Sequence, residues 1–186
     1  MDFRLSGSPA TSIGIAVGVV LSFLLLLAMM PGLFLVTLLS GGSATMPVED
    51  LLICQDTLSW PLADYGTECI TSPFGLRSSP GGIGSTDHKG IDIGVPAGTE
   101  ILAAGDGTVT ISAYNLVMGN YVEIDHGNGI KTRYEHMQKR LCSVGDVVSS
   151  GDVIGKVGST GVSTGAHLHF EVRLNDKPYN PIQVFS

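Results

Sequence analysis

Two short segments of the sequence combine imidazole and carboxylate groups at spacings that suit a metal site. In His88-Lys-Gly-Ile-Asp92, the glycine and the neighbouring isoleucines favour an extended chain. Residues i and i+4 of a strand project from the same face, so His88 and Asp92 would converge. In His167-Leu-His169, residues i and i+2 share a face in the same way. Both segments therefore predict a strand with one chemically active face.

This residue set matches the chemistry of catalytic zinc. Two imidazoles and one carboxylate leave a fourth tetrahedral position open to water, as in catalytic rather than structural zinc sites. Zn²⁺ suits mixed nitrogen and oxygen ligands, and a water bound to it ionises with a pKa near ~7. The sequence has no HExxH segment, which would supply its own glutamate base. A spare histidine is the expected base instead.

Three other residues carry weaker signals. His136 ends a predicted strand in the segment Tyr-Glu-His, where it could act as that base. His126 falls in a predicted turn and is interpreted as a surface residue outside the site. Glu171 follows the second histidine pair and could hydrogen-bond a ligand histidine, although a structural or solvated role fits the sequence equally well.

The sequence predicts an all-β fold. From residue 70 onward, short runs rich in β-branched residues alternate with Gly, Asn and Asp turns, and 126–129 predicts a tight hairpin turn. No run of ten or more residues has helical periodicity, so we expect a mostly antiparallel sheet domain with few or no helices outside the membrane. The predicted strands are 90–94, 100–104, 107–113, 120–126, 130–136, 153–157 and 168–174.

One transmembrane helix is expected before this domain. Residues 13–39 form an uncharged stretch of 27 residues, longer than a ~30 Å hydrocarbon core requires. A cleaved signal peptide is the alternative, because 42–44 resembles a small-residue cleavage site, but a signal peptide has an apolar region of only about 7–15 residues. Arg4 favours a cytoplasmic tail over 1–12.

The sequence thus describes a single-pass protein of the cell membrane. Residues 40–59 are predicted to be a linker, and 60–186 an extracytoplasmic domain. The net charge is −7 with no basic run, which argues against nucleic-acid binding. A disulfide between Cys54 and Cys69 is conceivable in an exported domain, and buried thiols in the core are the alternative for these residues and for Cys142.

Residues 60–181 resemble the lysostaphin/LytM family of zinc metallopeptidases. The motifs that carry this resemblance occur in the family's order: SPFGLRSSP, HKGIDI, VPAGTEILAAGDGTV, YVEIDHGNGIKTRYEHM, VGDVVSSGDVIGKVGSTG and STGAHLHFEVR. The segment YEHM varies a commoner YAHL pattern. The resemblance implies a domain of the LytM type.

The resemblance also implies roles for individual residues. His88, Asp92 and His169 would be the ligands of one Zn²⁺, and His136 and His167 would be catalytic. Which of the two catalytic histidines is the base stays open. No residue of the active-site pattern is missing.

The implied function is a membrane-anchored endopeptidase that hydrolyses peptide crosslinks of bacterial peptidoglycan. Its partners would be the peptidoglycan peptide and the lipid bilayer, and the sequence names no protein partner. A catalytically silent envelope scaffold, or an activator of another cell-wall hydrolase, is the alternative, because some relatives have lost ligands. A lipoyl- or biotinyl-type carrier fits less well, because residues 107–115 contain no lysine.

Overall fold

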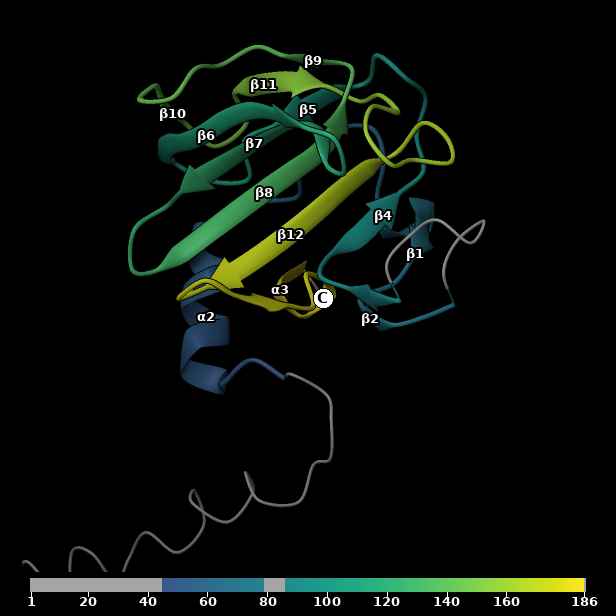
Figure 1. Ribbon diagram of the computed structural model, residues 1–186. Helices are drawn as coiled ribbons and strands as arrows, with labels where there is room; N and C mark the ends of the chain where they lie inside the picture. The colour runs from purple at the N-terminus through teal and green to yellow at the C-terminus, as the bar shows by residue number, and fades with distance from the viewer. Residues whose placement is uncertain (1–44, 79–85, 186) are drawn as a thin grey trace, which may run out of the picture. The chain divides into compact units, whose positions relative to one another are not determined.

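Antiparallel strands dominate the structure, a computed structural model that describes residues 45–78 and 86–185 (Figure 1). The main sheet has the strand order β1-β4-β12-β8-β7-β6-β10, and β13 pairs with β12. Its strands are β1 (Ile70–Ser72), β4 (Ile91–Ile93), β6 (Gly107–Asn115), β7 (Gly119–Asp125), β8 (Ile130–Met137), β10 (Val147–Val148), β12 (Leu168–Leu174) and β13 (Lys177–Tyr179).

Two smaller sheets complete the domain. One consists of β5 (Glu100–Leu102), β11 (Val153–Lys156) and β9 (Lys139–Arg140), and the other of β2 (Gly75–Leu76) and β3 (Asp87–His88). The predicted all-β, mostly antiparallel class is confirmed, and each of the seven predicted strands is present. The strands that the sequence does not predict are only two or three residues long. Such strands are too short to show an alternating pattern.

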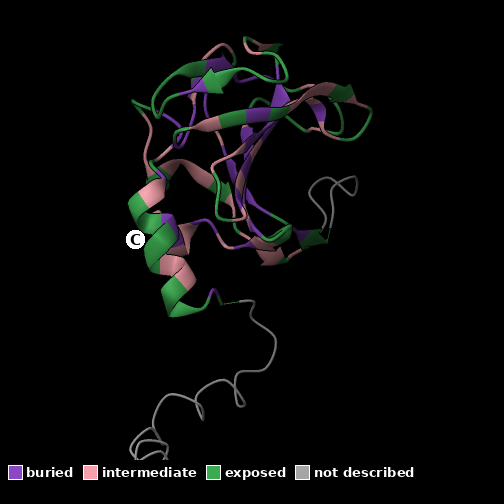
Figure 2. Ribbon diagram, turned by 90° about the vertical axis from the view of Figure 1, so that its left-hand side faces the viewer, coloured by how far each residue is buried: buried purple, intermediate pink, exposed green. Residues whose placement is uncertain are grey.

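Strict alternation gives the main sheet one apolar and one polar face. On β12, Leu168, Phe170 and Val172 are fully buried in the core. His169 and Glu171 project from the opposite face, as period-two geometry requires. Buried residues run along the central strands in Figure 2. The apolar face packs into the core and so holds the strands in place. The polar face carries the side chains that line the pocket.

A helix occupies part of the predicted linker. Helix α2 (Val48–Thr57) belongs to the same compact unit, residues 44–186, as the sheet. Its residues Leu51 and Cys54, with Leu58 just beyond its end, pack against the core at spacings of three and four residues. It also contacts the short helix α3 (Ile182–Phe185). Helix α2 thus occupies residues 48–57 of the segment predicted to be a linker, with Leu52 exposed on its outer side.

The cysteines are all free, which contradicts the conceivable Cys54–Cys69 disulfide. Cys54 is buried in the core, and burial raises the pKa of its thiol to about 11. Its interpretation as a core residue is confirmed.

In the described part of the chain, no helix has the length and apolar character needed to cross a bilayer. The predicted anchor, 13–39, and the tail before it lie outside the described residues.

Candidate metal and catalytic site

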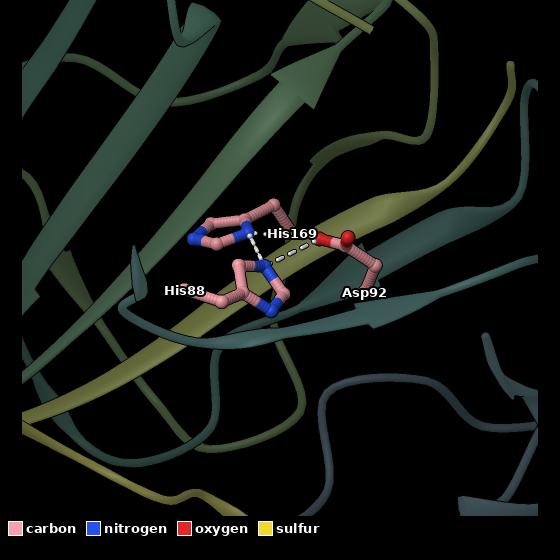
Figure 3. Close-up of side chains that lie close together, drawn as sticks. All are labelled: His88, Asp92 and His169. Carbon is pink, nitrogen blue, oxygen red and sulfur yellow. Dashed lines mark hydrogen bonds and ion pairs between the residues drawn. The ribbon is translucent and has the colours of Figure 1, made fainter. Parts of the chain in front are cut away.

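Three side chains from separate strands meet at one point of the polar face (Figure 3). His88 lies on β3, while Asp92 on β4 and His169 on β12 are direct partners in the antiparallel register. His88 Nε2 lies 3.0 Å from Asp92 Oδ1 and 3.0 Å from His169 Nδ1, and the last two atoms are 2.9 Å apart. The three predicted metal ligands are therefore brought together.

The hydrogen bonds on the outer side of each ring determine which nitrogen faces inward with a lone pair. His88 Nδ1 lies 2.7 Å from the carbonyl oxygen of Pro73, which can only accept, so this nitrogen carries the proton. His169 Nε2 lies 3.4 Å from Glu171 Oε1, a carboxylate that likewise accepts. Two imidazole nitrogens and a carboxylate oxygen thus converge at one point, an arrangement that a bound cation would stabilise.

The dimensions and charges of this cluster fit zinc. Ligand atoms at about 2.0–2.1 Å from a tetrahedral ion are roughly 3.3 Å apart, close to the spacing observed. Burial disfavours a charge on Asp92, yet hydrogen bonds from His169 and His88 hold the pKa of its carboxyl well below the usual range. Burial likewise opposes a charge on His169, but hydrogen bonds with Asp92 and Glu171 raise its pKa to about 10. The site therefore favours positive charge at its centre.

Neighbouring residues hold the ligands in place. Arg77 Nη1 donates to Asp92 Oδ2 at 2.8 Å, which leaves Oδ1 directed to the centre. A Cβ atom at Gly90 would lie 2.2 Å from the carbonyl oxygen of Phe170, so only glycine permits β4 to approach β12 here. The structure also gives Glu171 a defined role, because it holds the outer nitrogen of His169.

The two predicted catalytic histidines stand beside this cluster. His136 Nδ1 donates to the carbonyl oxygen of Thr160 at 2.8 Å, and His167 Nδ1 to that of Gly165 at 2.8 Å. Each ring therefore presents its Nε2 atom away from that carbonyl, and His167 Nε2 lies 3.7 Å from Asp92 Oδ1. The two ring centroids are 4.8 Å apart. Both histidines could accept a proton at Nε2.

His136 has two properties of a functional residue. Its backbone φ of 61° lies in the left-handed region, which is uncommon for a residue with a side chain. Burial also lowers the pKa of its imidazole to about 4, so the ring is neutral at pH 7. The ring is therefore fixed in position and unprotonated at pH 7, as a proton acceptor must be.

A pocket of about 340 Å³ opens over these groups. Val117 and Met118 from the β6–β7 turn and Val162 from the loop before β12 line its wall, and Glu135 lies on its floor. Burial raises the pKa of the Glu135 carboxyl to about 7. Sequence reasoning missed both Arg77 and Glu135. The alternation of β8, with buried Tyr134 next to it, could have placed Glu135 on the active face.

His126 does not line this pocket and is half-buried rather than fully exposed. Its Nδ1 donates to the carbonyl oxygen of Asp106 at 2.8 Å, and its Nε2 lies 2.7 Å from Thr132 Oγ1. Thr132 is fully buried and lies 2.8 Å from the hydroxyl oxygen of Tyr134, on the core face of the sheet. His126 thus lies in a turn away from the metal cluster, as expected, although its two ring hydrogen bonds hold it against the sheet and leave it half-buried.

We expect His126→Ala to lower stability while leaving the site intact. Loss of its two hydrogen bonds should reduce the free energy of unfolding by about 1–3 kcal/mol. Denaturant unfolding measures this, with metal content and peptidase activity of the folded protein as controls. A fully folded variant that keeps its metal but loses activity would contradict our placement of His126.

A family model described as peptidase family M23 matches residues 86–181, more than half of the 186 residues. The chain belongs to this family. The M23 match includes each residue of the cluster described above.

Known proteins agree with this assignment. The peptidoglycan DD-endopeptidase ShyC of Vibrio cholerae is 49% identical over 94 residues, which are 50% of this chain and 22% of that protein. This chain spans less than a third of the length of the curated relatives it matches. A zinc-containing peptidase from Vibrio cholerae superposes with a TM-score of 0.60 and 34% identity over 67% of this chain and 39% of that one.

The likeness extends to lysostaphin. The catalytic domain of this antimicrobial peptidase from Staphylococcus simulans is 30% identical, with a TM-score of 0.56, over 61% of this chain and 90% of that one. The resemblance expected from the sequence motifs is thus confirmed at the level of family and fold.

Proposed function

We propose that this protein is a zinc metalloendopeptidase that hydrolyses peptide crosslinks of bacterial peptidoglycan. The observation that carries the proposal is the convergence of His88, Asp92 and His169 beside His136 and His167 at an open pocket. The pocket volume falls in the usual range for binding sites, roughly 300–1,000 Å³. The peptidoglycan substrate is supported by the described activity of the relative ShyC.

Each residue has a defined task in this proposal. His88 Nε2, Asp92 Oδ1 and His169 Nδ1 would hold one zinc ion. Zinc lowers the pKa of a water ligand to about 7 and so supplies a nucleophile at neutral pH. The Nε2 atoms of His136 and His167 can accept a proton from the attacking water and return it to the leaving amine.

Digestion of purified sacculi tests this function. The full-length chain, solubilised in detergent and loaded with zinc, should release fragments whose masses identify one type of cleaved peptide bond. The matched control is Asp92→Asn, which keeps the shape of the side chain and removes its charge. Undigested sacculi, with zinc bound in stoichiometric amount, would favour the silent scaffold instead.

We also propose that 13–39 is a retained membrane anchor that holds the peptidase domain outside the membrane. The support is the 27-residue uncharged stretch, which is long enough to span a bilayer. We expect the protein to stay in the membrane fraction after washes with high salt and alkaline carbonate. Recovery of a soluble mature form that begins near residue 45 would show that the segment is cleaved.

A further inference from the structure

Glu135 is a buried carboxylate that none of the roles described above explains. It lies on β8 opposite His169 of β12 in the antiparallel register, next to the catalytic residue His136. Its side chain is only 9% exposed. Because Tyr134 fills the core face, Glu135 must project from the polar face, where it lines the same pocket as the histidines.

The carboxylate of Glu135 has no hydrogen-bond donor within residues 45–78 and 86–185. Its nearest cation is Arg133 Nη1, at 4.0 Å. Arg133 directs its Nε and Nη2 atoms to Glu123 Oε2 instead, at 3.2 and 2.7 Å. The second arginine of this face, Arg173, donates to Glu171 Oε2 at 2.7 Å. Each neighbouring acid thus has a donor, and Glu135 lacks one.

Without a protein donor, the Glu135 carboxylate facing this open pocket is satisfied by solvent or by a bound group. A second metal ion is one conceivable group, since ligand atoms of Glu135, His169 and Glu171 lie within 4.8 Å of one another. Two arginines already neutralise this region, however, and the outer nitrogen of His169 is the expected donor to Glu171. A hydrogen-bond donor of the bound substrate is therefore a better partner for Glu135 than a second metal ion.

A peptide in the pocket brings such donors. In its ionised form, which a donor would stabilise, the Glu135 carboxylate can only accept hydrogen bonds, and every peptide unit of an extended substrate offers an N–H group. Glu135 is the register partner of His169 and lines the same pocket, so a peptide bound at the metal ligands lies within its neighbourhood.

We propose that Glu135 is a substrate-binding residue whose carboxylate accepts a hydrogen bond from a backbone N–H of the bound peptide. This contact rests on the proposed peptidase function and adds a determinant of where the peptide lies relative to the metal. A hydrogen bond to a charged acceptor contributes roughly 10- to 100-fold in equilibrium terms.

Kinetics of Glu135 variants on a soluble crosslinked peptide test the contact. In the zinc-loaded full-length protein, Glu135→Ala should raise KM and lower kcat/KM by roughly 10- to 100-fold, with kcat and zinc content close to wild type. Glu135→Gln, which keeps a neutral acceptor, should fall between the two. The matched control is Glu123→Gln, which removes a carboxylate from the same sheet face but does not line the pocket.

A substrate series makes the test specific. Peptides methylated at one amide nitrogen at a time should include one whose kcat/KM on the wild type falls by a similar factor, because its donor is gone. That penalty should disappear in Glu135→Ala and persist in Glu123→Gln. The proposal would be overturned by an unchanged KM in Glu135→Ala. It would also be overturned if methylation lowered kcat/KM equally at every amide in the wild type and in Glu135→Ala, or if Glu135→Gln lost its zinc.

Binding measurements separate this contact from catalysis. In a zinc-loaded His136→Ala background, calorimetry should show that the unmethylated peptide binds and that adding Glu135→Ala weakens binding by the same factor. If the peptide binds in this way but the wild type never cleaves it, the proposed hydrolysis fails while the contact stands. If Glu135→Ala leaves peptide affinity unchanged, the contact is refuted.

Discussion

His88→Ala, Asp92→Ala and His169→Ala should each abolish stable zinc binding and, with it, peptidase activity. Every one of these side chains contributes one of three inward-facing acceptor atoms, so each variant keeps only two. Loss of an outer partner of a metal ligand typically costs about 10- to 100-fold in metal affinity. Loss of a ligand itself should cost more, which leaves the protein metal-free after dialysis.

Elemental analysis of the purified variants measures this directly, together with hydrolysis of the crosslinked peptide. The control is His126→Ala, a histidine bound to Asp106 and Thr132 away from the site, which should keep about one zinc per folded chain. Stoichiometric zinc in His169→Ala would show that the assignment of the ligands is wrong.

The spacing of residues in the sequence predicts much of this site, because in a strand this spacing determines the face from which each side chain projects. The i, i+2 spacing of His167 and His169 places both on one face, and the structure has the predicted strand with the predicted bounds. What the pattern does not contain is the strand order. The pairing of β4 with β12 brings Asp92 opposite His169 across 77 residues of sequence, and only the assembled sheet shows it.

The features that escaped prediction depend on such long-range contacts. Helix α2 is held by the core and by α3, including a hydrogen bond from Gln55 Nε2 to the carbonyl oxygen of Gln183 at 3.4 Å. His126 becomes half-buried because its ring hydrogen-bonds the carbonyl oxygen of Asp106. Arg77 reaches Asp92 from another strand pair. In each case the decisive partner is distant in sequence, so composition and periodicity could not identify it.

His136→Ala and His167→Ala should separate catalysis from metal binding. Neither imidazole is needed to complete the three-atom cluster, so both variants should retain about one zinc per chain and a native fold. Their turnover should nevertheless fall by about 10²- to 10⁴-fold, the usual contribution of a positioned acid or base. Metal analysis and hydrolysis rates on the same preparations test both expectations.

The two histidines make the same kind of hydrogen bond, but they differ in how the backbone holds them. Each donates Nδ1–H to a backbone carbonyl, of Thr160 or of Gly165, and presents a basic Nε2 to the pocket. His136 is further constrained by its left-handed backbone, whereas His167 stands two residues before a ligand on the same strand face. Alanine at His167 could therefore disturb His169, and the zinc content of that variant decides whether its rate loss is catalytic. Full activity in a zinc-loaded His136→Ala protein would show that His136 is not the required base and would leave His167 as the remaining proton acceptor.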